Sequence, residues 1–115
     1  AAVRAWLTRL PSWLVVEQVA EAADVRLARL DPGERQAIQL AKREHADLLL
    51  VDETLGVRIA REQGLAVTGT LGVLPQAARR GLVDLEAALT HLQETDFRCS
   101  RRVMEEVRRR AKAST

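Results

Sequence analysis

The sequence predicts an α/β protein with a parallel sheet flanked by helices. Two short apolar runs, 47–51 and 65–68, are expected to form buried strands. Segments with helical spacing of apolar residues alternate with these runs, and such alternation is typical of a parallel sheet with crossover helices. With 115 residues, of which 47% are hydrophobic and 3% aromatic, the chain is expected to form one domain (1–115) around an aliphatic core.

The N-terminal third is predicted to contain a helix, a strand and a short helical turn. Residues 1–10 show helical spacing of apolar residues, and Pro11 ends that helix. The run 13–19 is rich in β-branched residues and predicts a strand. We interpret Trp6 and Trp13 as core residues because both lie in apolar contexts. Residues 20–30 are expected to form a short helix or turn, with three side chains inward: Val25, Leu27 and Leu30.

The middle of the chain carries two clear helix starts. Asp31 is expected to cap a helix that runs to about His45, with Pro32 in its first turn and Glu34 near the positive end of its dipole. Thr54 is expected to cap a second helix, which Gly64 ends. These helices would lie before and after the strand at 47–51, as a parallel sheet requires.

The C-terminal part is predicted to be helical. A turn at 69–72 leads into a helix that Gly81 ends, and its inward residues are predicted to be Val73, Leu74 and Ala77. Asp84 and Ser100 are plausible N-caps for two final helices, 84–94 and 100–112.

Charge and cysteine content narrow the functional classes. The net charge is +2, and arginines crowd the last segment; a basic helix can face nucleic acid, although a solvated helix face is the commoner interpretation. The single Cys99 excludes an intrachain disulfide, and we interpret it as a small packed residue. We find no apolar run of membrane-spanning length and no secretory signal, so a cytoplasmic location is expected.

Two carboxylates are the best candidates for chemistry. Glu34 alone is explained as a first-turn helix stabiliser. Asp52 follows a buried strand, where a carboxylate needs a solvating partner or a metal. Because ligands of α/β proteins tend to lie beyond the carboxyl ends of the strands, the pair predicts a shared metal site there, with the carboxylates within about 10 Å. Glu53 is either a third oxygen ligand or an acid that leads into the next helix.

Other polar residues have ordinary explanations. Asp47 precedes the strand, so it is expected at the opposite end of the strand from Asp52. His45 is expected at the end of a helix, where a positive charge interacts favourably with the helix dipole. The glycine-rich turn at 69–72 offers backbone N–H groups that could bind phosphate, but it lacks the lysine of a nucleotide-binding loop, so a tight turn is favoured.

Several segments in combination resemble a branch of the PIN-domain superfamily, the DUF3368 group. They are Leu30-Asp31-Pro32-Gly33-Glu34, Ala46-Asp47-Leu48-Leu49-Leu50-Val51-Asp52-Glu53 and Val67-Thr68-Gly69-Thr70-Leu71-Gly72-Val73-Leu74, followed by Ala77 and Arg80-Gly81-Leu82. The tail from Asp96-Phe97-Arg98-Cys99-Ser100 onward is also similar to that branch. The resemblance covers essentially the whole chain.

The resemblance implies a Mg²⁺- or Mn²⁺-dependent ribonuclease, related to the toxins of toxin–antitoxin pairs. Glu34 matches the acid on the central helix of the family and Asp52 the acid after its fourth strand, and Glu53 stands near the place of a fourth acid. Both catalytic and metal-binding roles are therefore expected of Glu34 and Asp52. The expected partners are RNA, contacted by Arg58 or Arg61, and an antitoxin protein; both arginines are equally well explained as solvated residues.

One departure from the family is expected to matter. The family begins with a strand ending in Asp, and this chain shows no such segment, so we expect it to be the C-terminal portion of a PIN-like domain whose central strands are absent. Fewer carboxylates should weaken the metal site, and unpaired strand edges should favour homo-oligomers. The alternative function is a truncated, non-enzymatic module that binds proteins or nucleic acid.

Overall fold

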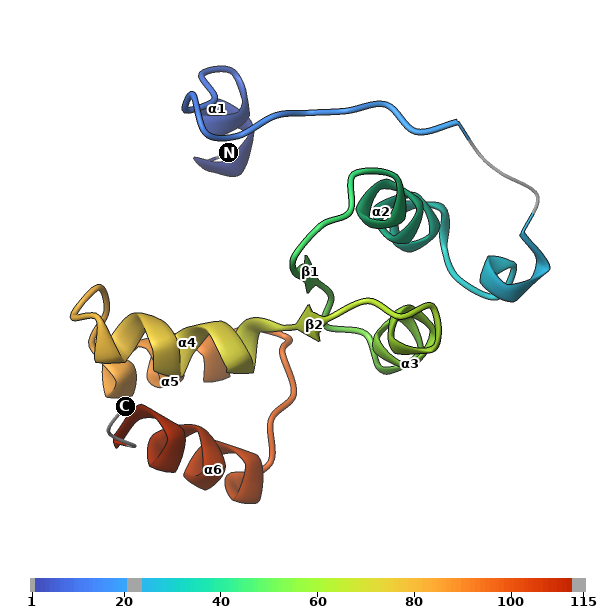
Figure 1. Cartoon of the computed structure of the whole chain (residues 1–115). Coiled ribbons are helices and arrows are strands. Elements are labelled where there is room, and N and C mark those ends of the chain that lie inside the picture. The colour runs from blue at the N-terminus through green and yellow to red at the C-terminus, as the bar shows by residue number, and fades with distance from the viewer. Residues whose placement is uncertain (1, 21–23, 113–115) are drawn as a thin grey trace.

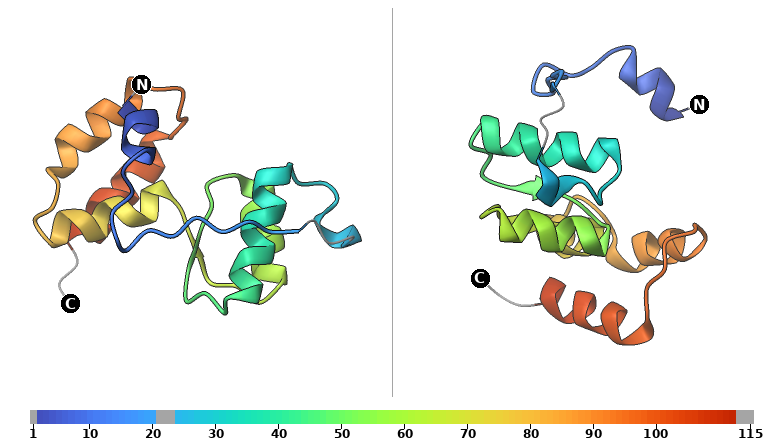
Figure 2. Two further views of the ribbon diagram at one scale, coloured as in Figure 1. Left: turned by 90° about the horizontal axis from the view of Figure 1, so that it is seen from above. Right: turned by 90° about the vertical axis from the view of Figure 1, so that its right-hand side faces the viewer.

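A small parallel sheet lies at the junction between two groups of helices in the computed structural model, which describes residues 2–20 and 24–112 (Figure 1). The sheet consists of β1 (Leu49–Leu50) and β2 (Val67–Thr68). On one side lie η1 (Val25–Leu27), α2 (Pro32–Arg43) and α3 (Thr54–Glu62), and on the other lie α4 (Thr70–Arg79), α5 (Leu85–Gln93) and α6 (Arg101–Lys112) (Figures 1 and 2). The predicted α/β class is confirmed.

The two strands pair in parallel, with Leu49 opposite Val67 and Leu50 opposite Thr68. The backbone N–H of Leu49 donates to Ala66 (2.9 Å) and that of Val51 donates to Thr68 (2.9 Å). Alternate residues of a parallel strand direct their backbone groups to opposite edges, so Leu50 faces away from β2. Among the described residues no third strand pairs with this edge.

An aliphatic cluster packs α2 and α3 against the sheet. The predicted inward residues Leu27 and Leu30 are buried in it, but Val25 is 87% exposed, so that part of the prediction was wrong. The buried members are Leu27, Leu30, Ile38, Ile59 and Ala60, and the partly buried members are Leu49, Leu55, Leu65 and Val67. This cluster fixes the N-terminal end of α2, which carries Glu34, near the end of β1.

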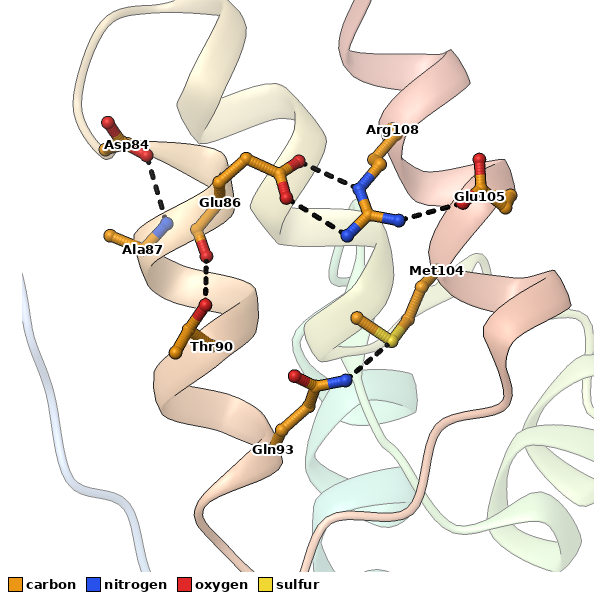
Figure 3. Close-up of polar contacts among 8 residues, drawn as sticks. All are labelled: Asp84, Glu86, Ala87, Thr90, Gln93, Met104, Glu105 and Arg108. Atoms are coloured by element: carbon orange, nitrogen blue, oxygen red, sulfur yellow. Dashed lines mark hydrogen bonds and ion pairs between the residues drawn. The ribbon is translucent and has the colours of Figure 1, made fainter.

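A second cluster holds the three C-terminal helices together. Its buried residues are Leu89, Met104 and Val107, with Leu71, Leu74, Leu85 and Cys99 packed against them. The guanidinium of Arg108 bridges α5 and α6 through Glu86 (2.8 and 3.0 Å) and also contacts Glu105 (2.9 Å) (Figure 3). Val73, which was predicted to face inward, is 42% exposed, so that prediction was wrong.

Three of the predicted helix starts are confirmed by their caps, whereas the prediction that Thr54 caps α3 was wrong: Thr54 is the first residue of the helix, and the N-cap residue Glu53 makes no side-chain capping hydrogen bond. The carboxylate of Asp31 accepts the N–H of Glu34 (2.8 Å), and that of Asp84 accepts the N–H of Ala87 (3.0 Å). The hydroxyl of Ser100 accepts the N–H of Val103 (3.2 Å). Gly64 and Gly81 follow their helices with φ of 84° and 72°, the left-handed conformation that glycine adopts without strain.

The N-terminal segment differs from prediction. The helix α1 (Ala2–Leu7) forms, but Trp13 lies in a turn and 14–19 forms neither helix nor strand. Trp6 and Trp13 are 47% and 75% exposed and contact each other, with ring centroids 6.4 Å apart, instead of lying in a core. The end of this run contacts α2 instead of a strand: the guanidinium of Arg43 donates to the backbone carbonyl of Gln18 (3.3 Å) and pairs with the carboxylate of Glu17 (3.6 Å).

None of the described helices combines the length and the apolar composition needed to cross a membrane.

Candidate metal and nucleic-acid site

The candidate site forms where β1 ends and three helices begin or pass nearby. After Leu50 the chain leaves the sheet through Val51, Asp52 and Glu53 and enters α3. Beyond β2, Gly69 leads into α4. Because both strands run in the same direction, their carboxyl ends meet at one edge, which is where the ligands of parallel sheets lie.

Glu34 reaches this edge from the first turn of α2. An ideal Cβ built on Gly56 of α3 would lie 3.2 Å from Oε2 of Glu34 and 2.9 Å from Cγ1 of Val51, so the carboxylate lies against the helix that follows β1. Burial raises the pKa of Glu34, and the nearby charges of Asp31 and Glu53 raise it further. Glu34 is thus a partly desolvated carboxylate with like charges around it.

The carboxylate of Asp52 is held by hydrogen bonds from Thr70, the first residue of α4. Its Oδ1 accepts the backbone N–H of Thr70 (2.8 Å) and its Oδ2 accepts the Thr70 hydroxyl (2.7 Å). Gly69 permits this approach, because an ideal Cβ there would lie only 2.5 Å from Oδ1. Asp52 remains exposed at the mouth of a cavity of about 270 Å³, whose lining is Leu50, Val51, Asp52, Gly69, Thr70, Val73 and Leu74.

The arrangement separates the predicted acids into two neighbourhoods. Glu34 and Glu53 are close enough for one charge to affect the other, while both carboxylate oxygens of Asp52 bond to Thr70. The cavity beside Asp52 does not include Glu34 in its lining. The prediction that Glu34 and Asp52 converge within one concavity therefore stays a prediction.

Comparison with known families decides the identity of the fold. A family described as a PIN domain, DUF3368, matches residues 3–113. The chain belongs to this PIN-domain family. No curated protein and no solved structure matches the chain.

The PIN domain's carboxylates fit a divalent cation in chemistry. Carboxylate oxygens are the ligands that Mg²⁺ and Mn²⁺ prefer, and a cation beside Glu34 would relieve the repulsion from Asp31 and Glu53. In number they fit less well: across residues 2–20 and 24–112, no three acidic, histidine or cysteine side chains gather closely enough to hold an ion. The three acids predicted as ligands, Glu34, Asp52 and Glu53, therefore stay a prediction.

The basic residues of the PIN domain are distributed unevenly between paired and exposed positions. On α6, Arg108 bonds to Glu86, while Arg109 and Arg110 contact Glu106, so much of the basic tail is neutralised within the fold. This pairing favours the solvated-face interpretation of α6. On α3, Arg58 and Arg61 are exposed and lie one helical turn apart.

Thr70 and Gly56 were missed as site residues at the sequence level. Thr70 lies in the glycine-rich run 69–72, which the sequence analysis interpreted only as a phosphate-binding loop or a tight turn. In the structure the Thr70 N–H is occupied by Asp52, and an ideal Cβ on Gly72 would lie 2.1 Å from the Thr68 hydroxyl oxygen. These glycines permit close packing at the end of the sheet. Nothing in the sequence marked Gly56.

Proposed function

We propose that this PIN domain is a divalent-cation-dependent ribonuclease, with a cation site to which Glu34 and Asp52 contribute. The observation that carries the proposal is the environment of Glu34, where burial and two neighbouring carboxylates raise the pKa. Like charges held close together cost stability, and groups whose pKa is perturbed in this way occur preferentially at functional sites. Membership of the PIN family supports the same interpretation.

The proposed roles follow from the geometry. Glu34, with its raised pKa, is suited to accept a proton during hydrolysis, and Asp52 offers an oriented carboxylate at the sheet edge. Glu53 adds negative charge beside Glu34, and we propose that Arg58 and Arg61, which are exposed on α3, contact RNA phosphates. When bound, Mg²⁺ or Mn²⁺ would polarise the scissile phosphate and lower the pKa of an attacking water.

We further propose that this chain cleaves RNA slowly on its own. A site made from so few acids would hold a cation loosely, and misplacement by about 1 Å can cost about 10²-fold in rate. The test is cleavage of a labelled RNA with Mn²⁺, with and without EDTA, by the wild type, Asp52→Asn and the matched control Glu105→Gln on α6. The proposal expects slow, EDTA-sensitive cleavage that Asp52→Asn abolishes and Glu105→Gln retains. Equal cleavage by all three proteins, or cleavage in EDTA, would contradict it.

A second candidate function, a binding module without catalysis, is favoured by one specific observation. A groove of about 460 Å³ runs between the extended N-terminal segment, α2 and the free edge of β1. Leu48 lines this groove and is 52% exposed, and Leu50, which lines the cavity beside Asp52, is 65% exposed, whereas Val67 is half-buried. An exposed strand edge with apolar side chains is a pairing site. A second copy of the chain, or an antitoxin protein, is the partner we propose for it.

The two candidates are separated by measuring self-association and cleavage on the same preparation. Light scattering over a range of concentrations reports dimers, and the RNA assay reports catalysis. A chain that dimerises and never cleaves, whichever metal is added, supports the binding module, while metal-dependent cleavage supports the nuclease.

A further inference from the structure

The packing of the chain is divided at the boundary between β2 and α4 (Figure 1). The apolar cluster around α2 and α3 takes all its residues from 24–68, and the cluster around α4, α5 and α6 takes all its residues from 70–112. The helices follow the same division, because α2 and α3 contact the sheet whereas α4, α5 and α6 contact one another, and α4 meets the sheet at β2. We call 24–68 the sheet unit and 70–112 the helical unit.

A cavity of about 270 Å³ lies on this boundary. Its lining comes from both units, with Leu50, Val51 and Asp52 at the exit from β1 and Gly69, Thr70, Val73 and Leu74 at the start of α4. Protein cores are packed with few voids larger than a water molecule. Apolar packing therefore does not hold the two units together at this point.

The side chain of Asp52 spans the boundary beside this cavity. Its Oδ1 accepts the backbone N–H of Thr70 (2.8 Å), and its Oδ2 accepts the Thr70 hydroxyl (2.7 Å). Two bonds on two different oxygens fix the direction of the contact as well as its length, and a charged acceptor strengthens both. By contrast, the hydrogen bond from Lys42 to Gln63 stays within the sheet unit, and the ion pairs of α6 stay within the helical unit.

The chain itself crosses the boundary at Gly69. Glycine has the greatest backbone freedom of any residue, so the peptide link alone does not fix the angle between the units. An ideal Cβ at Gly69 would lie 2.5 Å from Oδ1 of Asp52 and 3.0 Å from the carbonyl oxygen of Val51. The absence of a side chain therefore lets Asp52 reach Thr70, and it also leaves a flexible joint that needs a second point of attachment.

We propose that the contact between Asp52 and Thr70 is a latch that fixes the orientation of the helical unit against the sheet, and that α4 pivots about Gly69 when this contact is broken. The latch needs no cation, so it is independent of the proposed function. It gives Asp52 a structural role that depends on the hydrogen bonds of its two outer atoms and not on its charge.

The test compares Asp52→Ala, which removes both acceptors, with the matched control Asp52→Asn. The amide of the control still accepts the Thr70 N–H and donates to the Thr70 hydroxyl. Backbone residual dipolar couplings, measured in EDTA, are fitted separately for the two units. We expect one shared alignment in the wild type and in Asp52→Asn, and loss of the shared alignment in Asp52→Ala, because its units reorient independently.

A second pair of variants decides the matter if Asp52→Ala does not fold. Thr70→Val loses the hydroxyl bond and should lose part of the shared alignment, while Thr70→Ser keeps both bonds and should match the wild type. A shared alignment that persists in folded Asp52→Ala, or in Thr70→Val when that variant is needed, overturns the latch. So does an equal loss in Asp52→Asn. RNA cleavage is a separate readout, because Asp52→Asn should lose cleavage and keep the shared alignment.

Discussion

The carboxylate of Glu34 lies directly against Gly56, where an added methyl group would stand 3.2 Å from Oε2 and 2.9 Å from Cγ1 of Val51. This contact joins the start of α2 to α3 at the end of β1. We predict that Gly56→Ala forces Glu34 and Val51 apart and lowers the free energy of unfolding by about 1–3 kcal/mol. Urea unfolding measures this change.

The matched control for that substitution is Gly33→Ala in the first turn of α2. There an added Cβ would lie 3.6 Å from Oδ1 of Asp31, an ordinary contact. Alanine is the better helix former by roughly 0.5–1 kcal/mol, so Gly33→Ala should be neutral or stabilising. A Gly56→Ala protein as stable as Gly33→Ala would show that the packing around Glu34 is loose.

Protonation of Glu34 should stabilise the fold, which is the reverse of the usual effect for a carboxyl group. Its pKa in the fold is raised above the ordinary 4.5, chiefly by burial. The folded state therefore holds the proton more tightly than the unfolded state, and stability falls as pH rises from the ordinary pKa through the raised one. We predict that Glu34→Gln is more stable than the wild type at about pH 7, and that this gain disappears at about pH 4. Urea unfolding at the two pH values tests it.

Glu86 should show the opposite pH dependence. Its hydrogen bonds to Arg108, drawn in Figure 3, lower the pKa of this carboxyl below 4.5. Its contribution to stability is present above the unfolded pKa and is lost as pH falls through the folded one. We predict that Glu86→Gln destabilises the protein slightly at neutral pH, and that wild type and variant converge in acid. Thermal unfolding of both proteins across this range would contradict the ion pair if their difference stayed constant.

The free edge of β1 gives a prediction about association. Leu50 is 65% exposed and directs its backbone away from β2. We predict that Leu50→Lys shifts the chain toward monomer in concentration-dependent light scattering, because a charged residue at a strand edge opposes edge pairing. Val3→Lys, at an exposed residue of α1, is the control and should leave association unchanged. A wild type that stays monomeric at high concentration would count against the edge as an interface.

Local signals made much of this fold predictable from sequence. Asp31, Asp84 and Ser100 were recognised as caps because short polar side chains before apolar periodic segments satisfy free N–H groups at helix starts. Gly64 and Gly81 were recognised as helix ends for their conformational freedom. The strands were expected at 47–51 and 65–68 from continuous apolar runs, and the structure narrows them to Leu49–Leu50 and Val67–Thr68.

Features that depend on long-range neighbours were missed. Residues 13–19 have strand composition, but a strand needs a partner edge, and composition does not say whether one is present. Trp6 and Trp13 were expected in the core because their neighbours in sequence are apolar, but such neighbours do not show that a core lies against them. Thr70 was also overlooked, because its contact with Asp52 joins positions far apart in the chain. Glu34 and Asp52 stay predicted site residues, and their arrangement relative to each other was not predictable from local sequence.

The most direct test of the central claim, a divalent-cation site at the carboxyl end of β1, is a Mn²⁺ titration of the isotopically labelled protein followed by NMR. Paramagnetic broadening falls steeply with distance and so locates the ion. The account predicts that broadening appears first at Glu34, Asp52, Glu53 and Thr70, and that Asp52→Asn weakens it. Broadening centred on the acidic residues of α6, Glu105 and Glu106, or no site-specific broadening, would contradict the account.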